Sequence, residues 1–310
     1  MMSIVSARQA RPLVILGPTA SGKSSLALGL AAELGNVELV SVDSMQVYRG
    51  MDIGTATPTQ AEQAIVAHHL INIVDPSTPF TVGEFQARAK LAIAQITERG
   101  NIPVLVGGTG LYLRSLVDNL EFPGQFPDVA RDLDAEPDTE ALHRRLGELD
   151  PLGASRMEPT NRRRILRALE VTIGSGQPFS SFGPGMEAYP ATPFVQVALR
   201  WPRDTLNQRI ADRYQEQMER GFLNEVRWLK QVGPSVTAAQ ALGYRELLTH
   251  LDGQCTLEEA IATAVSRTRR FARRQERWFR RDPRVQWVDG PADVMEVVQI
   301  WDRIVRTPPN

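Results

Sequence analysis

The chain has a single cysteine, Cys255, which excludes an intramolecular disulfide and a zinc site built from several thiolates. Its apolar runs fall far short of the roughly 20 residues of a membrane span, and the N-terminus lacks the apolar stretch of a signal peptide. These absences predict a cytoplasmic protein with no membrane partner, and we expect a monomer. Since 42% of the 310 residues are apolar and 23% are charged, the chain can bury a substantial core.

Acidic residues are scarce in one segment, although the net charge of the whole chain is only −1. From Arg267 to Arg284 there are nine arginines and two acidic residues, Glu276 and Asp282, so this segment carries 9 − 2 = +7. The remainder of the chain therefore carries −1 − 7 = −8. This asymmetry favours a polyanionic partner larger than a nucleotide.

The strongest local motif is a glycine-rich loop, Gly17-Pro18-Thr19-Ala20-Ser21-Gly22-Lys23-Ser24. It follows the apolar run 13–16 and precedes a helical pattern, which is the strand, loop and helix context of a phosphate-binding loop, or P-loop. The glycines allow backbone N–H groups to converge on a phosphate at the start of a helix. Lys23 adds a positive charge, and the Ser24 hydroxyl is placed to ligate Mg²⁺ as a cofactor. The motif predicts polyphosphate binding without identifying the polyphosphate.

Two other predicted strands end in segments with candidate functional residues. The run 37–42 is followed by Asp43, which is either a functional carboxylate at the carboxyl edge of a sheet or an ordinary turn residue. The run 102–106 is followed by Gly107-Gly108-Thr109-Gly110. These glycines either allow another group to approach closely, with the Thr109 hydroxyl offered to it, or form a tight turn only.

The pattern of helices and strands predicts an α/β fold with a P-loop NTPase-like core, a parallel sheet flanked by helices, and a small helical insertion domain. Pro, Gly and Asp cluster after residue 119, helical patterns follow at 139–149 and 161–173, and a Gly/Pro/Ser-rich linker closes the segment. We therefore expect a first part of the core at 1–118, the insertion at 119–193, and the second part of the core with a basic C-terminal helix at 194–310.

That basic helix is predicted to begin after Thr256, which forms a capping box with Glu259, and to end near Arg281. An inward stripe is expected at Ile261, Val265, Thr268 and Ala272. Steps of three and four place five arginines on another face: Arg267, Arg270, Arg274, Arg277 and Arg281. This face is either solvated or bound to an anion, and the interleaved aromatic residues favour RNA with unpaired bases.

Taken together, these residues resemble the tRNA dimethylallyltransferases, also called tRNA isopentenyltransferases or the IPP transferase family. The similarity extends over nearly the whole chain, and it is carried by the P-loop and by several further motifs. These are Asp43-Ser44-Met45-Gln46-Val47-Tyr48, Gly50-Met51-Asp52-Ile53-Gly54-Thr55-Ala56, Val106-Gly107-Gly108-Thr109-Gly110-Leu111-Tyr112, Arg167-Ala168-Leu169-Glu170-Val171, Gly221-Phe222, Glu225-Val226-Arg227, Gly243-Tyr244-Arg245, Arg273-Arg274-Gln275 and Trp278.

The resemblance implies transfer of a dimethylallyl group from dimethylallyl diphosphate to N6 of the adenosine at tRNA position 37, next to the anticodon, with release of diphosphate. In the family the P-loop holds the diphosphate, the residue matching Asp43 is the general base, and those matching Thr109 and Arg213 hold the leaving group. The resemblance assigns contacts with the tRNA anticodon stem-loop to Asp43, Ser44, Met45, Gln46, Gly110, Arg131, Arg163, Arg164, Arg167, Gly243, Tyr244, Arg245, Arg273, Arg274, Arg277 and Arg280.

The chain departs from the family pattern within the insertion. Thr160-Asn161-Arg162 stands where an Asn-Asp pair is common, and the region 122–140 is short. Two other functions remain as alternatives: a small-molecule kinase that uses ATP with Asp43 as its base, and an RNA-binding protein with a vestigial nucleotide site. The arginine-rich helix and the absence of an acid after the strand 102–106 argue against a kinase. The intact Lys23, Ser24 and Asp43 argue against a vestigial site.

Overall fold

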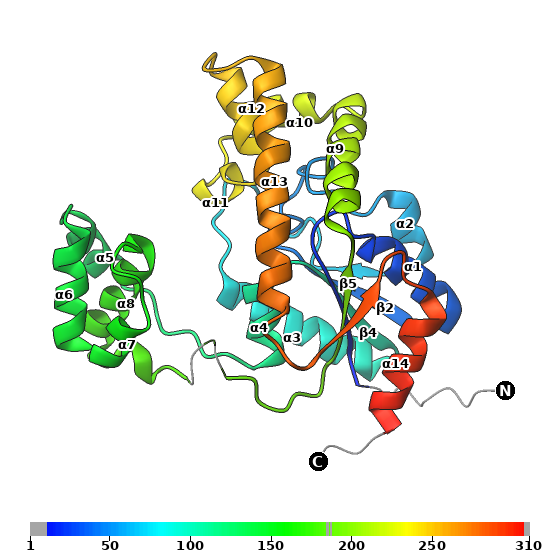
Figure 1. The fold of residues 1–310 in the computed structure, drawn as a ribbon, viewed down its shortest axis with the longest axis horizontal. Helices are drawn as coiled ribbons and strands as arrows, with labels where there is room; N and C mark the ends of the chain where they lie inside the picture. The colour runs from blue at the N-terminus through cyan, green and yellow to red at the C-terminus, as the bar shows by residue number, and fades with distance from the viewer. Residues whose placement is uncertain (1–10, 184–185, 187, 307–310) are drawn as a thin grey trace. The chain divides into compact units, whose positions relative to one another are not determined.

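The computed structural model describes residues 11–183, 186 and 188–306 and contains a six-stranded sheet in its larger unit (Figure 1). Its strands are β1 (Leu13–Leu16), β2 (Val37–Val42), β3 (His68–His69), β4 (Ile102–Gly107), β5 (Val195–Arg200) and β6 (Val285–Asp289). Their order is β3-β2-β4-β1-β5-β6, and every pair of neighbours is parallel. The predicted parallel α/β core is confirmed.

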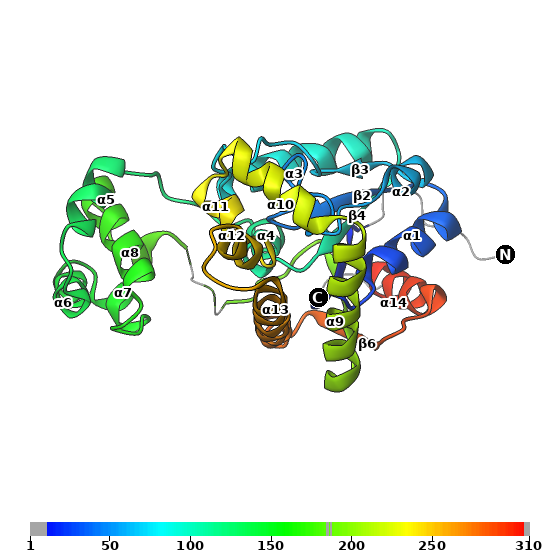
Figure 2. The same ribbon diagram turned by 90° about the horizontal axis from the view of Figure 1, so that it is seen from above.

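The strands are nearly continuous apolar runs because helices cover both faces of the sheet. Every residue of β1 and β2 is buried, and successive side chains point to opposite faces. Leu13 and Ile15 pack with α1 (Lys23–Leu34) and α14 (Val294–Arg306), whereas Val14 and Leu16 pack with α3 (Val82–Glu98) and α4 (Gly110–Val117). Figure 2 shows the sheet between these two helical layers.

The strand register brings three functional segments to one edge of the sheet. Gly107, the last residue of β4, pairs with Leu16 of β1 on one side and with Val42 of β2 on the other. The next residues in the three strands are therefore Gly17 of the P-loop, Asp43, and Gly108 of the turn that contains Thr109. This edge is where parallel sheets bind their ligands.

A second group of helices lies beyond this edge (Figure 1). It comprises α9 (Arg203–Glu219), α10 (Phe222–Val232), α11 (Val236–Ala239), α12 (Tyr244–Leu251) and α13 (Leu257–Phe279), while the short α2 (Gln60–Ile65) follows β2 along the chain. None of the helices in the described ranges is long and apolar enough to cross a membrane.

The inward face of α13 differs from the prediction in its first half. Thr268 and Ala272 are buried as expected, but Ile261 and Val265 are only half-buried. The face that packs inward is made by Ala260, Ala264, Thr268, Ala272, Gln275 and Phe279. The small alanine side chains allow α13 to approach α12 and α9 closely, so the larger neighbouring residues lie at the margin of the contact.

The segment Asp118–Pro190 is a separate compact unit, and the rest of the chain, Met1–Val117 and Ala191–Asn310, is the other. Its described elements are α5 (Pro127–Asp134), α6 (Thr139–Leu149), α7 (Pro151–Ser155), α8 (Arg162–Ser175) and a short 3₁₀ helix (Phe179–Ser181). A core of its own includes Leu133, Leu146, Ile165 and Leu169. The insertion is therefore an independently packed helical unit.

Candidate functional site

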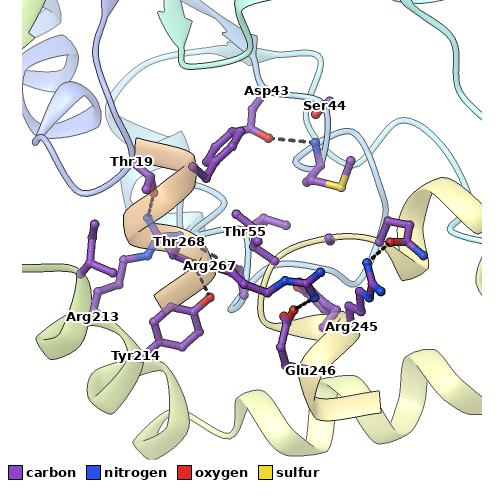
Figure 3. Close-up of a pocket in the computed structure, with 18 of the residues that line it drawn as sticks. Thr19, Asp43, Ser44, Thr55, Arg213, Tyr214, Arg245, Glu246, Arg267 and Thr268 are labelled. Atoms are coloured by element: carbon purple, nitrogen blue, oxygen red, sulfur yellow. Dashed lines mark hydrogen bonds and ion pairs between the residues drawn. The ribbon is translucent and has the colours of Figure 1, made fainter. Parts of the chain in front are cut away.

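A cavity of about 540 Å³ opens among the P-loop, the ends of β2 and β4, and the helices α9, α12 and α13 (Figure 3). It brings together residues that are far apart in the sequence. Its lining includes Thr19, Asp43, Ser44, Met45, Gly54, Thr55, Thr109, Arg213, Tyr214, Gln217, Gln240, Tyr244, Arg245, Glu246, Arg267, Thr268, Arg270, Phe271 and Arg274.

The P-loop borders the site through Thr19 and leads directly into α1. Gly22 adopts a left-handed conformation (φ 88°), and no side chain caps the helix N-terminus that follows it. Three loop carbonyls, those of Pro18, Ala20 and Ser21, accept hydrogen bonds from Lys23, Arg209 and Trp201 respectively. Because no side chain caps the N-terminus of α1, the N–H groups of its first turn are available to bind an anion.

Lys23 is folded back onto the loop, where its Nζ donates to the Pro18 carbonyl at 2.8 Å. Burial lowers the pKa of Lys23 to about 8, the nearby Asp43 carboxylate opposes this effect, and Arg213 adds to it. Ser24 lies beside Lys23 on a smaller cavity of about 50 Å³ that Asp43 also borders. An anion at the start of α1 would favour the charged form of this lysine.

Asp43 combines a turn role with a place on the cavity wall. Its Oδ1 accepts hydrogen bonds from the backbone N–H groups of Met45 at 2.8 Å and Gln46 at 3.4 Å (Figure 3). Asp43 is therefore a turn residue, as one of the two interpretations of the sequence predicts. Both bonds go to one oxygen, and Oδ2 receives no hydrogen bond from the described residues. Asp43 also lines both cavities, which leaves its second oxygen available to a substrate proton.

The glycines around Thr109 are required by close packing. A Cβ atom on Gly107 would lie 2.1 Å from the Val42 carbonyl, and one on Gly108 would lie 2.3 Å from Gln275 Nε2. A Cβ atom on Gly110 would lie 2.4 Å from Trp278 Nε1. The groups that approach this turn are thus β2 and side chains of α13. Thr109 itself lines the cavity, and its Oγ1 accepts the Ser44 N–H at 3.2 Å.

Arg213 projects from α9 into the cavity beside the P-loop. Its guanidinium donates to Thr19 Oγ1 at 2.9 Å and to the Gly54 carbonyl at 3.3 Å (Figure 3). Burial lowers the pKa of Arg213, but nearby Asp43 and other groups oppose the shift. Arginine starts from so high a value that the guanidinium remains charged at neutral pH.

Glu225 of α10 fixes the loop that carries Gly54. Its carboxylate accepts the backbone N–H groups of Asp52, Ile53 and Gly54 at 2.9, 2.7 and 3.0 Å, and also the Tyr244 hydroxyl. Burial, together with this carboxylate, raises the pKa of Tyr244 well above its usual value, so its hydroxyl stays protonated and donates. In the sequence, Glu225 stands out only as part of the Glu225-Val226-Arg227 motif, which indicates no role for its side chain.

Tyr244 was predicted to contact tRNA, but its side chain is fully buried. Its ring packs edge-on against Phe222, with ring centroids 4.9 Å apart. Its hydroxyl donates to Glu225, so the side chain has a structural role in this part of the cavity wall. Its neighbour Arg245 is exposed and lines the cavity.

Arg267 is a correction to the predicted arginine face. It is paired with Glu246, whose buried carboxylate also accepts the Gly243 N–H at 2.8 Å (Figure 3). Because a buried carboxylate needs a charged partner, Arg267 joins α13 to α12 and is not free to neutralise RNA. The other four arginines, which we name the arginine surface, are exposed: Arg270, Arg274, Arg277 and Arg281.

The remaining predicted RNA contacts fall into two groups. In the core, Arg273 and Arg280 are exposed near the end of α13, and Arg280 pairs with Glu276. In the insertion, Arg163 and Arg164 are exposed on α8 and Arg131 pairs with Asp128 on α5. Arg167 is tied to Glu170 and to the carbonyls of Pro123 and Gly124, so it holds the insertion together.

Gln46 has a structural role in the turn after β2. It accepts from the Ser41 hydroxyl and donates to the carbonyls of Thr55 and Ala56, while its side chain borders the smaller cavity. The cavity residues that sequence reasoning did not assign to the site include Tyr214, Gln217 and Glu246. A polar residue at a buried helical position is the only signal that could have identified them.

Comparison with known proteins agrees with this geometry. The family model described as IPP transferase matches residues 46–282. The chain is 46% identical over 304 residues to the tRNA dimethylallyltransferase of Streptomyces coelicolor, covering 96% of each chain. It is 45% identical over 296 residues to the enzyme of the same name from Thermobifida fusca, covering 92% of this chain and 91% of that one.

Solved structures lead to the same conclusion. The tRNA isopentenylpyrophosphate transferase of Bacillus halodurans is 40% identical and has a TM-score of 0.68, with 95% of each chain covered. A eukaryotic dimethylallyltransferase acting on tRNA is 28% identical and has a TM-score of 0.77, covering 90% of this chain and 74% of that one. These relatives give no support to the small-molecule kinase alternative. This chain belongs to the IPP transferase family.

Proposed function

We propose that the protein transfers the dimethylallyl group of dimethylallyl diphosphate to N6 of the adenosine at tRNA position 37 and releases diphosphate. The observation that carries the proposal is the composition of one cavity. Asp43, Thr109 and Arg213 line it together with Thr19 of the P-loop and with Arg270 and Arg274 of α13. An anion site, a free carboxylate oxygen and a basic helix thus border the same space.

The diphosphate end of the donor fits the P-loop wall. Three kinds of donor are available: the N–H groups at the start of α1, the Lys23 ammonium group, and the Arg213 guanidinium, which its hydrogen bonds to Thr19 and Gly54 hold in place. As the bond between the allylic carbon and the diphosphate oxygen breaks, negative charge grows on that oxygen. Donors that are already in place stabilise this charge without reorganising, which is commonly a large part of an enzyme's rate enhancement.

Asp43 is suited to act as the base for the acceptor. An exocyclic adenine amine is a weak nucleophile, so its proton must leave as the bond between N6 and the allylic carbon forms. The Oδ2 oxygen of Asp43 can accept that proton while Oδ1 stays bound to Met45 and Gln46. The backbone bonds would hold the carboxylate in place throughout the reaction.

A Mg²⁺ ion fits this site only as a companion of the diphosphate. The described residues contain no cluster of three or more His, Cys, Asp or Glu side chains that could hold a metal by themselves. The Ser24 hydroxyl at the start of α1 would supply one oxygen ligand, and Mg²⁺ is usually held by few protein ligands together with phosphate oxygens and water. When bound, the ion would neutralise charge on the leaving diphosphate.

The test uses two donors, each carrying a radioactive label, with total tRNA. Dimethylallyl diphosphate is labelled in its dimethylallyl group and ATP in its γ-phosphate, and the RNA is then digested to nucleosides. We expect the dimethylallyl label on adenosine and none of the ATP label on RNA. If only the ATP label were attached, or if neither were, the proposed function would be wrong.

A further inference from the structure

A single glutamine of α13 reaches two parts of the candidate site at once. Gln275 is 7% exposed and lies on the inward face of the helix. Its Oε1 accepts the backbone N–H of Thr19 in the P-loop at 2.9 Å, and its Nε2 donates to the Gly108 carbonyl at 2.9 Å. Both functional ends of its amide are therefore used, one on each segment.

These two segments are the ones proposed to hold the leaving diphosphate. Thr19 also accepts a hydrogen bond from Arg213 through its hydroxyl, so Gln275 and Arg213 hold the same residue at its backbone and its side chain. Gly108 immediately precedes Thr109, and a Cβ atom at Gly108 would come within 2.3 Å of Gln275 Nε2. The position of the glutamine thus fixes both loops relative to α13.

The remaining surface of the same helix is basic and exposed near Gln275. Arg273, Arg274 and Arg277 lie within two residues of Gln275 and point to solvent or to the cavity. α13 is one continuous helix of 23 residues, so an RNA bound to these arginines and a diphosphate bound to the P-loop act on the same rigid element. Gln275 therefore links the helix that carries these arginines directly to the two loops that would hold the diphosphate.

We propose that Gln275 is a positioning residue that couples RNA binding on α13 to diphosphate binding at the P-loop. This inference rests on the proposed function. Coupling between two sites is reciprocal, so RNA should tighten diphosphate binding by the same factor by which diphosphate tightens RNA binding. A glutamine that only satisfied two buried backbone groups would contribute to stability and would leave the two affinities independent.

The test is a binding cycle on the full chain with inorganic diphosphate and an anticodon stem-loop RNA as probes. The dissociation constant of diphosphate is measured by calorimetry with and without saturating RNA. In the natural protein we expect RNA to tighten diphosphate binding by about fivefold or more, which is the lower end of typical coupling between sites. Gln275→Met keeps the side-chain volume. In this variant we expect RNA to change the dissociation constant of diphosphate by less than about twofold, while the affinity for RNA alone stays as in the natural protein.

A second variant breaks the same contact from the other side. Gly108→Ala would displace the Gln275 amide, and it should lose the coupling as Gln275→Met does. Gln254→Met, at an exposed position before α13, is the matched control and should keep the full factor. Thermal unfolding of every variant shows that the measured chain is folded.

Two results would overturn the inference: independent binding of the two probes in the natural protein, or full coupling in a folded Gln275→Met variant. Neither would affect the proposed function, because transfer of labelled dimethylallyl groups is measured separately. A natural protein that couples the two probes but transfers no label would instead contradict the proposed function.

Discussion

Arg213 Nη1 donates a hydrogen bond to Thr19 Oγ1 at 2.9 Å, although the two residues are 194 positions apart in the sequence. The second arm of the guanidinium donates to the Gly54 carbonyl at 3.3 Å. The charged group is therefore held between the P-loop and the loop that follows β2. A rigidly placed guanidinium at a diphosphate site can stabilise developing charge without a change of conformation.

We expect Arg213→Lys to lower turnover by about 10²- to 10³-fold, the usual cost of losing one positioned donor. Lysine keeps the charge, but its compact ammonium group cannot bridge Thr19 and Gly54 as the planar fork does. Steady-state kinetics with both substrates varied would measure the effect. Arg220→Lys, at an exposed position just after α9, is the control and should behave as the natural protein. A change confined to the KM for tRNA would place Arg213 in RNA binding instead.

Asp43→Asn should reduce turnover by at least ~10², the low end for loss of a general base. The amide oxygen can still accept the N–H groups of Met45 and Gln46, so the turn should persist and tRNA affinity should change little. Asp75→Asn provides a matched control, because Asp75 makes a similar turn with Ser77 outside the residues that line the cavity. Single-turnover rates and tRNA binding should be measured together. Near-normal turnover in Asp43→Asn would leave Asp43 with its turn role alone.

The lowered pKa of Lys23 should make both the stability of the protein and its affinity for diphosphate depend on pH. Because burial lowers its pKa from 10.5 to about 8, the folded chain binds fewer protons than the unfolded chain between those values. The free energy of unfolding should therefore rise with pH between about 8 and 10.5, as Lys23 loses its proton in the folded chain first. Below about pH 8 the lysine is charged in both states, and this gain in stability is absent. Diphosphate binding has the opposite dependence, because the anion needs the charged lysine. Its affinity should fall by up to about tenfold per pH unit above 8.

Calorimetry in buffers of different ionisation enthalpy checks this prediction, since diphosphate binding above pH 8 should take up a proton. Lys90→Met, on α3, should leave that proton uptake intact, whereas Lys23→Met should abolish it. Binding at pH 9 without proton uptake would contradict the lowered pKa.

The arginine surface predicts a steep dependence of tRNA affinity on salt. Each phosphate contact made by Arg270, Arg274, Arg277 or Arg281 should contribute about 0.7 to the slope of log affinity against log salt on single-stranded segments. Replacing one of them by glutamine should weaken tRNA binding and reduce the slope by a comparable step. Diphosphate affinity in the absence of RNA should not change. Unaltered affinity and slope in a double variant would show that this surface is only solvated.

Arg267 offers a contrast within the same helix. Its partner Glu246 has a side chain only 3% exposed, so Arg267→Gln would leave a buried carboxylate without its charged partner. That change should affect the stability of the protein before it affects the salt slope. The two kinds of arginine on α13 can thus be distinguished by urea unfolding.

The parts of the fold that sequence reasoning found are those in which local pattern decides structure. The apolar runs of β1 and β2, the P-loop and the capping box at Thr256 were predicted where they occur, because each depends on neighbouring residues. The role of Gln275 was not foreseen, because its partners Thr19 and Gly108 lie 256 and 167 residues away. The sequence contains one indication of this role. Gln275 has the helical spacing of the inward-facing Thr268, Ala272 and Phe279, and a polar residue at such a position needs hydrogen-bond partners.

Arginine spacing could not separate paired from exposed side chains. Arg267 and Arg270 obey the same helical steps, yet only the packing of α12 against α13 places Glu246 beside the first of them. Likewise, Tyr244 belongs to a motif whose exposed member is Arg245. Periodicity gives the face of a helix, whereas burial of an individual side chain depends on which element covers it.

Glu225 supplies the last prediction. Its carboxylate accepts three backbone N–H groups from residues 52–54 and the hydroxyl of Tyr244, and the Gly54 carbonyl in that loop accepts from Arg213 and Gln217. Glu225→Gln would place an NH₂ group against N–H donors and remove the charge that strengthens these bonds. We expect the free energy of unfolding to fall by about 1.5–3 kcal/mol, the range for hydrogen bonds to a charged group.

The same variant should also affect the diphosphate site, because a displaced Gly54 carbonyl frees one arm of Arg213. We expect weaker diphosphate binding in Glu225→Gln, measured by calorimetry at a temperature where the variant is folded. Tyr244→Phe is the matched comparison, since it removes one donor to Glu225 and leaves the three backbone bonds in place. It should cost less stability and leave diphosphate affinity near that of the natural protein. Typical surface substitutions change the free energy of unfolding by no more than about 0.5 kcal/mol. If Glu225→Gln changed it by no more than that, the carboxylate would not be what holds this loop.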